Sequence, residues 1–148
     1  ALRMREFGVK PEIEVFDLSM LYQALRLADE GVLEKPLHVQ FVMGVKNALP
    51  AIVQAFHFMV DELQRLAPGA TWVAAGIGRH QLEVNRWCLE RGGHCRTGLE
   101  DNIRWDETRL AASNAELVAR VAKICREYGR HPANAAEARR LLGLKDTP

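Results

Sequence analysis

Four short segments rich in β-forming residues alternate along the chain with longer segments in which apolar residues recur at helical spacing. The predicted strands cover residues 13–16, 37–42, 71–75 and 95–99, and each begins shortly after a proline or glycine. Amphipathic helices are predicted within residues 19–31, 48–69, 79–93 and 113–125, and a short helix over residues 135–142 ends the pattern. Strands that alternate with helices in this way predict a parallel sheet covered by helices, an α/β fold.

Capping signals mark the ends of two predicted helices. Ser19 is predicted to cap the start of the first helix and Gly31 its end, because a hydroxyl accepts from free backbone N–H groups and glycine tolerates the left-handed conformation. Ser113 and Glu116 fit a capping box at the start of the last long helix. Since no linker or repeat interrupts this pattern, residues 1–148 are predicted to form one domain.

Composition is that of an ordinary globular protein. The 148 residues include 20 Lys and Arg against 19 Asp and Glu, which excludes a strongly basic or acidic partner surface. No apolar stretch approaches the roughly 20 residues of a membrane helix, and the N-terminus lacks the apolar core of a signal peptide, so a cytoplasmic location is predicted. The three cysteines form no Cys-x-x-Cys pair and are predicted to be free thiols.

The residues just after the predicted strands are candidates for a ligand site, because the loops at the carboxyl ends of parallel strands converge. In the fourth strand Arg96 and Glu100 share one face, since alternate residues point to the same side. They form either an internal ion pair or a site in which Glu100 is a metal ligand or base and Arg96 orients a carboxylate. Asp101 directly follows Glu100, so in a continuous strand its side chain would point to the opposite face. Asp101 joins this site only if the strand ends or bends there.

The third strand is followed by the segment GIGRH, residues 76–80. Gly76 and Gly78 allow the backbone to approach a ligand closely, and Arg79 and His80 are candidate contacts for a phosphate. Gln81 stands where a dinucleotide fingerprint has its third glycine, which excludes that type of site. A tight turn with exposed Arg79 and His80 is the alternative interpretation.

Other chemistry has less support in the sequence. No two histidines have metal-ligand spacing, so a zinc site completed within this chain is not predicted. The sequence has no Gly-x-Ser-x-Gly nucleophile elbow, and Cys95 lies at the amino end of its predicted strand, away from the expected opening.

Taken together and in order, these segments resemble the β-keto acid cleavage enzyme family. The similar stretches are EVFDLSMLYQALRLADEG, PLHVQFVMGV, ATWVAAGIGRHQ, GGHCRTGLEDN and SNAELV, which span residues 14–118. The resemblance implies a zinc-dependent TIM barrel that condenses a β-keto acid with acetyl-CoA, releasing acetoacetate and a new acyl-CoA. The family's RxGLED motif matches Arg96, Gly98, Leu99, Glu100 and Asp101.

The same resemblance implies roles for the motif residues. Glu100 is the implied carboxylate ligand of zinc, and Asp101, assisted by Arg96, is the implied base that deprotonates the substrate. Zinc would polarise the keto group as a Lewis acid and so lower the barrier to carbanion formation. Arg79 and His80 are our own candidates for contacts with the phosphates or the thioester of CoA, and the family does not supply that assignment.

The sequence departs from the family pattern in one respect. The family's two other zinc ligands form a His-x-His pair near the end of an early strand, and this sequence has no such pair. A (β/α)8 barrel typically has about 250 residues and eight strands, whereas four strands are predicted here. The chain is therefore expected to be the C-terminal half of a barrel, inactive alone, and to associate with the missing half or with itself through two exposed sheet edges.

Two other functions stay open at this point. The chain could belong to another metal-dependent TIM-barrel lyase or aldolase, which would act on a β-keto acid without acetyl-CoA. Alternatively, it could be a non-enzymatic α/β module that binds a phosphate-bearing ligand through residues 76–80, with Arg96 and Glu100 in structural roles. Such a module would tolerate the substitution Glu100→Gln.

Overall fold

The computed structural model describes residues 1–144, and the last four residues of the predicted domain 1–148 lie outside this part. Its four strands are β1 (Ile13–Val15), β2 (His38–Met43), β3 (Thr71–Gly76) and β4 (His94–Cys95). They form one parallel sheet in which each strand pairs with the next one in the sequence. This order is that of a singly wound sheet, as in part of a barrel, and it confirms the predicted α/β class.

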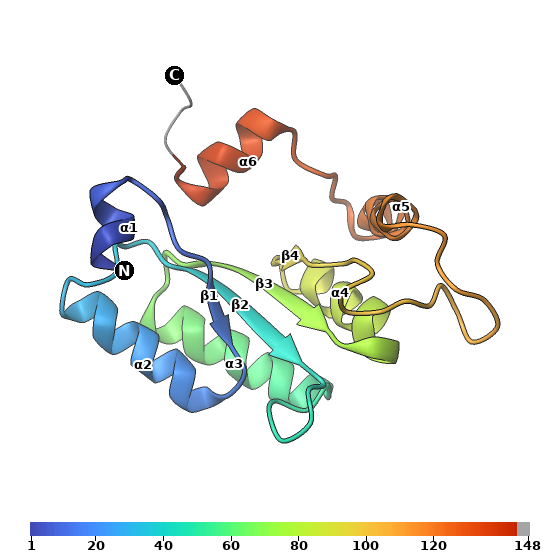
Figure 1. Cartoon of the computed structure of the whole chain (residues 1–148), viewed down its shortest axis with the longest axis horizontal. Coiled ribbons are helices and arrows are strands. Elements are labelled where there is room, and N and C mark those ends of the chain that lie inside the picture. Colours follow the sequence, from blue (N-terminus) through green and yellow to red (C-terminus); the bar gives the residue numbers. More distant parts are fainter. Residues whose placement is uncertain (145–148) are drawn as a thin grey trace.

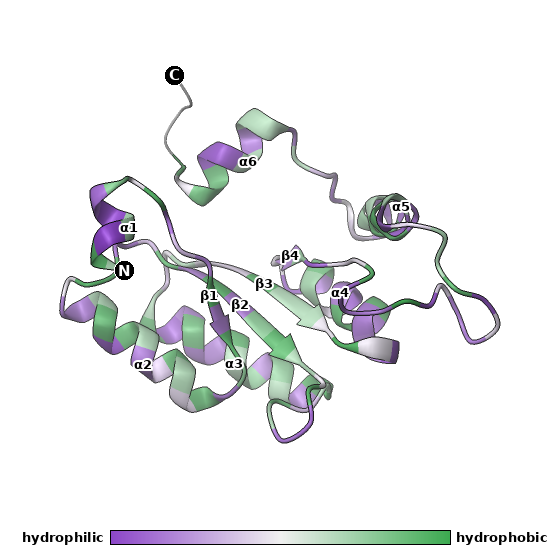
Figure 2. Cartoon of the chain, in the orientation of Figure 1, coloured by the Kyte–Doolittle hydropathy of each residue, from purple (hydrophilic) through white to green (hydrophobic). Residues whose placement is uncertain are grey.

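Helices follow the strands as the periodicity predicts. Within residues 1–144 they are α1 (Leu2–Glu6), α2 (Leu18–Asp29), α3 (Val53–Leu66), α4 (Gln81–Glu90), α5 (Asn114–Cys125) and α6 (Ala135–Leu142). Figure 1 shows α2 and α3 side by side along one face of the sheet, and hydrophobic and hydrophilic residues alternate along both helices (Figure 2). The helix α6 has the predicted bounds, whereas α1 was not predicted. None of the helices in this part of the chain is long and apolar enough to cross a membrane.

The hydrophobic core lies between the sheet and the helices α2, α3 and α4. Val39, Phe41 and Met43 of β2 are fully buried there, together with Leu21 of α2 and Phe56 of α3. Each such side chain contributes about 1.5–3 kcal/mol to folding. Because side chains alternate along a strand, the intervening residues point to the opposite face of the sheet, which we call the site face. Its strand residues include Glu14, Gln40, Val42, Val73 and Ala75.

The fourth strand is shorter than the predicted range 95–99. It ends at Cys95, and a turn over residues 98–101 follows. The backbone N–H of Leu99 donates to Asn114 Oδ1 at 2.7 Å and not to a neighbouring strand. The sequence pattern could not show this contact, because Asn114 belongs to α5.

The helix caps agree with the sequence in part. Asp17, and not Ser19, caps α2: Asp17 Oδ1 accepts from Met20 N at 2.9 Å and from Ser19 Oγ at 2.7 Å. Ser113 caps α5 as predicted, and its Oγ accepts from Glu116 N at 3.2 Å. The Glu116 carboxylate accepts from the backbone N–H of the residue before Ser113, so this half of the predicted capping box is displaced by one residue.

Candidate active site

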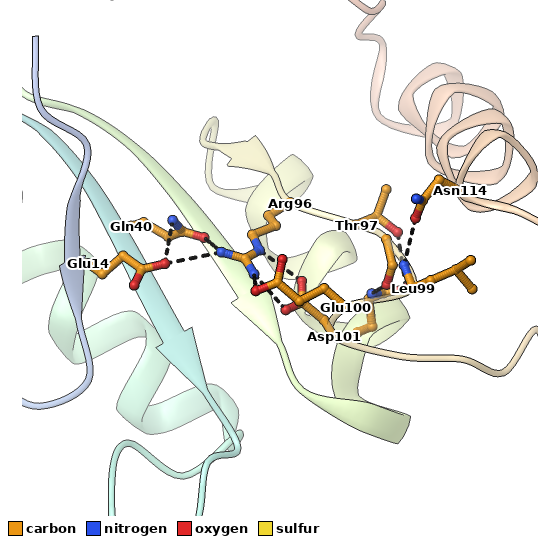
Figure 3. Close-up of polar contacts among 10 residues, drawn as sticks. Glu14, Gln40, Arg96, Thr97, Leu99, Glu100, Asp101 and Asn114 are labelled. Atoms are coloured by element: carbon orange, nitrogen blue, oxygen red, sulfur yellow. Dashed lines mark hydrogen bonds and ion pairs between the residues drawn. The ribbon is translucent and has the colours of Figure 1, made fainter. Parts of the chain in front are cut away.

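Arg96 occupies the centre of a polar network beyond the end of β4 (Figure 3). Its Nε donates to Asp101 Oδ2 at 2.9 Å, and its Nη2 donates to Asp101 Oδ1 at 2.8 Å. The Asp101 side chain is only 4% exposed. A paired contact of this kind is a strong and directional form of arginine–carboxylate bonding. Because β4 ends early and the chain turns, Asp101 joins Arg96 despite its opposite parity in the sequence.

Two residues of other strands hold the far side of the guanidinium. Nη1 of Arg96 donates to Gln40 Oε1 at 2.9 Å and to Glu14 Oε1 at 3.1 Å. Gln40 is 2% exposed, whereas the side chain of Glu14 is 47% exposed. Sequence reasoning missed both residues, because it searched the strand ends and not the strand interiors. The available signal was a single polar residue, Glu14 or Gln40, between apolar neighbours within a strand.

Glu100 approaches the same guanidinium from the solvent. Its Oε1 lies 3.1 Å from Arg96 Nη2, and its side chain is 85% exposed. The sequence placed Glu100 and Arg96 on one face of a strand, but in the structure Glu100 lies in the turn after β4. The buried partner of Arg96 is therefore Asp101, and Glu100 adds an outer contact.

Arg96 is the cation that the carboxylates of Glu14, Glu100 and Asp101 share. The hydrogen bonds to Asp101 raise the pKa of the Arg96 guanidinium above its ordinary value, and partial burial opposes this effect only in part. Arg96 is thus a permanent cation that compensates a buried carboxylate. Such a pair can accept a proton from a bound substrate while the carboxylate stays fixed in position.

Two further contacts hold the turn that carries Asp101. A side chain at Gly98 would place its Cβ 3.1 Å from Asn114 Oδ1, so the glycine allows the Asn114 amide to approach and accept from Leu99 N. Gly78 N donates to the backbone oxygen of Asp101 at 2.7 Å. The loop after β3 and the turn after β4 are therefore joined directly.

The predicted phosphate-binding segment forms a tight turn beside the site. A Cβ at Gly76 would lie 2.4 Å from the backbone oxygen of His80, which excludes any other residue without movement of the backbone. Gly78 has φ +62° at the start of the 3-10 turn η1 (Gly78–His80). Arg79 is exposed and His80 is half-buried. The two glycines serve the turn, and a role of Arg79 and His80 in phosphate binding stays a prediction.

The residues present do not make a complete zinc site. Residues 1–144 contain no group of three or more His, Cys, Asp or Glu side chains that could hold a metal ion. Glu100 is a single, largely exposed carboxylate that already faces Arg96. Since zinc sites in proteins use three or four protein ligands, further ligands would be needed.

The chain forms a singly wound parallel sheet, and a charged network extends from one face of β1 and β2 to the turn after β4. This is the architecture of part of a (β/α)8 barrel. The sequence model of the beta-keto acid cleavage enzymes matches residues 1–144. The chain belongs to this family, which confirms the resemblance seen in the sequence.

Named relatives agree with this assignment. The chain is 57% identical over 144 residues to the 3-oxoadipate:acetyl-CoA acetyltransferase of Cupriavidus necator, covering 97% of this chain and 51% of that protein. It is 44% identical over 140 residues to the 3-keto-5-aminohexanoate cleavage enzyme of Fusobacterium nucleatum subsp. nucleatum, covering 95% and 50%. The chain therefore spans about half the length of the curated relatives it matches.

A solved structure supports the fold. The apo structure of ObcA superimposes with a TM-score of 0.77 at 19% sequence identity, covering 95% of this chain and 38% of that chain. The four-stranded unit thus corresponds to part of a larger fold, as expected for a partial barrel.

Proposed function

We propose that this chain supplies the proton-transferring part of the active site of a β-keto acid cleavage enzyme. The enzyme would condense a β-keto acid with acetyl-CoA to give acetoacetate and a new acyl-CoA. The observation that carries the proposal is the buried carboxylate of Asp101, which Arg96 holds through two hydrogen bonds. The names of the relatives, an acetyl-CoA acetyltransferase and a keto acid cleavage enzyme, support it.

In this proposal Asp101 is the base. Each carboxylate oxygen keeps a free lone pair after accepting one hydrogen bond from Arg96, and Asp101 removes a proton from the carbon between the keto and carboxyl groups. The carbanion attacks the thioester carbonyl of acetyl-CoA, and CoA thiolate leaves. The thiolate then attacks the original keto carbon, the bond from that carbon to the carboxyl-bearing carbon breaks, and Asp101 returns its proton to give acetoacetate.

Zinc dependence belongs to the proposal as well. A bound zinc ion supplies Lewis-acid polarisation of a keto group. Glu100 is the proposed carboxylate ligand, because it is the exposed acid beside the Arg96–Asp101 pair. The remaining ligands would have to come from residues outside this chain.

The chain alone is expected to retain well below one zinc ion per molecule after dialysis and to show no turnover of a β-keto acid with acetyl-CoA. One exposed carboxylate provides too few ligands for a stable site. Elemental analysis and an acetoacetate assay measure both properties. Stoichiometric zinc together with turnover by this chain alone would contradict the prediction.

A complete active site is proposed to need a second part of the barrel. Within residues 1–144, β1 and β4 each pair with one strand, so each has a free edge to which another strand can add. Co-expression of this chain with the part of the Cupriavidus necator relative that it does not match tests this association; we call the product the reconstituted enzyme. Its first substrate to assay is 3-oxoadipate, after the name of that relative. Two parts that fail to copurify or to turn over substrate would count against the proposal.

In the reconstituted enzyme, Arg79→Ala is expected to raise the KM for acetyl-CoA about 10- to 100-fold and to leave kcat nearly unchanged. A contact between a charged side chain and a phosphate is worth about 1.5–3 kcal/mol, and the phosphates are remote from the reacting atoms. Arg126→Ala, at an exposed arginine of the 3-10 turn η2 (Arg126–Tyr128), is the control. An unchanged KM in the Arg79 variant would remove the CoA assignment.

A further inference from the structure

Gln40 is a buried polar residue in the middle of the sheet, and both ends of its amide are engaged. Its Oε1 accepts from Arg96 Nη1 at 2.9 Å, and its Nε2 donates to Glu14 Oε1 at 3.3 Å. Only 2% of the residue is exposed, and its neighbours in β2, Val39 and Phe41, are fully buried. Since β2 pairs with both β1 and β3, the backbone of Gln40 is held from two sides.

The position of Gln40 complements that of Asp101. Nε and Nη2 of Arg96 form one edge of the planar guanidinium and face Asp101, whereas Nη1 faces Gln40 and Glu14 (Figure 3). A rigid fork that is bonded on both sides cannot rotate about its own axis without breaking bonds. Gln40 therefore fixes the plane in which Arg96 presents its two donors to Asp101.

Position 40 requires a neutral hydrogen-bond acceptor for Arg96 Nη1. Three carboxylates, from Glu14, Glu100 and Asp101, already face one guanidinium. A fourth carboxylate at position 40 would add repulsion and compete with Asp101 for the charge of Arg96. An apolar residue would leave the Nη1 donor without its closest partner, which is costly for a partly buried group.

We propose that Gln40 is a positioning residue for the reaction, one that acts through Arg96 on the proposed base Asp101. Its effect on catalysis rests on the function proposed above. Its effect on Arg96 does not, because the hydrogen bond exists in this chain by itself. The two effects can therefore be tested separately.

The first test uses the 148-residue chain and the variant Gln40→Met, which keeps the length of the side chain and removes both hydrogen bonds. In the unmodified chain, NMR is expected to show separate side-chain Nη–H signals for Arg96, because bonds on both edges slow rotation of the guanidinium. In Gln40→Met only Glu14, whose side chain is 47% exposed, still accepts from Nη1. Rotation of the guanidinium is therefore expected to become faster and the signals to merge, while the backbone amide signals of β2 persist. A folded variant with the separate Arg96 signals intact would overturn the proposal.

Asn85→Leu is the matched control for this measurement. Asn85 is a buried amide on α4 whose side-chain atoms make no hydrogen bond within the described residues, so its replacement should leave the Arg96 signals separate. If Gln40→Met does not fold, Gln40→Asn replaces it. That variant keeps a neutral amide but shortens the side chain, which withdraws the amide oxygen from Nη1. A folded variant with shifted Arg96 signals is the expected result; signals identical to those of the unmodified chain would overturn the proposal.

The second test uses the reconstituted enzyme. Gln40→Met is expected to lower kcat by about 10- to 100-fold, since a misplacement of about 1 Å can cost that much, and to change KM for both substrates by less than threefold. A variant with the kcat of the unmodified enzyme would overturn the positioning role. If the unmodified reconstituted enzyme itself shows no turnover, the proposed function fails, and the NMR result alone decides what Gln40 does to Arg96.

Discussion

Replacement of Asp101 by Asn is expected to lower kcat of the reconstituted enzyme by about 10²–10⁴-fold, the range that general base catalysis contributes. Asparagine has nearly the same shape, but its amide cannot take up the substrate proton. One amide oxygen can still accept from Arg96, whereas the NH2 group would face the second donor. The variant is therefore expected to fold with a moderate loss of stability, about 1–3 kcal/mol.

Two measurements separate the loss of the base from a loss of binding. Steady-state turnover gives kcat, and exchange of the substrate's acidic C–H protons with deuterated water reports proton removal directly. Asp106→Asn is the control: Asp106 lies in the loop that follows the site, and its Oδ1 accepts only from Thr108 and Arg109 among the hydrogen bonds of residues 1–144. Proton exchange at the normal rate in Asp101→Asn would rule out Asp101 as the base.

Replacement of Arg96 by Met is expected to affect stability as well as activity. The Asp101 side chain, only 4% exposed, would lose both charged donors, and Gln40 would lose the donor to its carbonyl oxygen. Breaking a buried ion pair from one side costs about 3–5 kcal/mol, and the partial exposure of Arg96 places the expected loss near the lower end, about 3 kcal/mol. Turnover of the reconstituted enzyme is expected to fall below detection, since the base is no longer held.

The stability effect can be measured on this chain alone. Urea unfolding followed by tryptophan fluorescence is suitable, because Trp72 is 4% exposed in the core. The double variant Arg96→Met, Asp101→Asn should recover part of the loss, since it also removes the uncompensated charge. Arg86→Met is the control: its ion pair with Glu127 is exposed and contributes about 0–1 kcal/mol. Equal effects of the Arg96 and Arg86 replacements would show that the network is not a buried unit.

Local patterns were sufficient for most of the fold. Apolar periodicity and the positions of proline and glycine predicted the first three strands and the helices α2 to α6. These signals are local, because the residues that form each of them lie close together in the sequence. Arg96, Glu100 and Asp101 were found for the same reason: they lie within six consecutive positions of one strand-end segment.

The sequence by itself determined the alternation of strands and helices, and with it the end of the sheet at which the charged residues gather. Only the tertiary structure decided which side chains meet there. Glu14 and Gln40 reach Arg96 across 82 and 56 residues of sequence, and their meeting depends on the register of neighbouring strands. Asp101 reaches Arg96 because the chain turns after β4, and Leu99 in that turn donates to Asn114 of α5. Contacts of this kind join elements that are distant in the sequence, so the local pattern of apolar and polar residues cannot predict them.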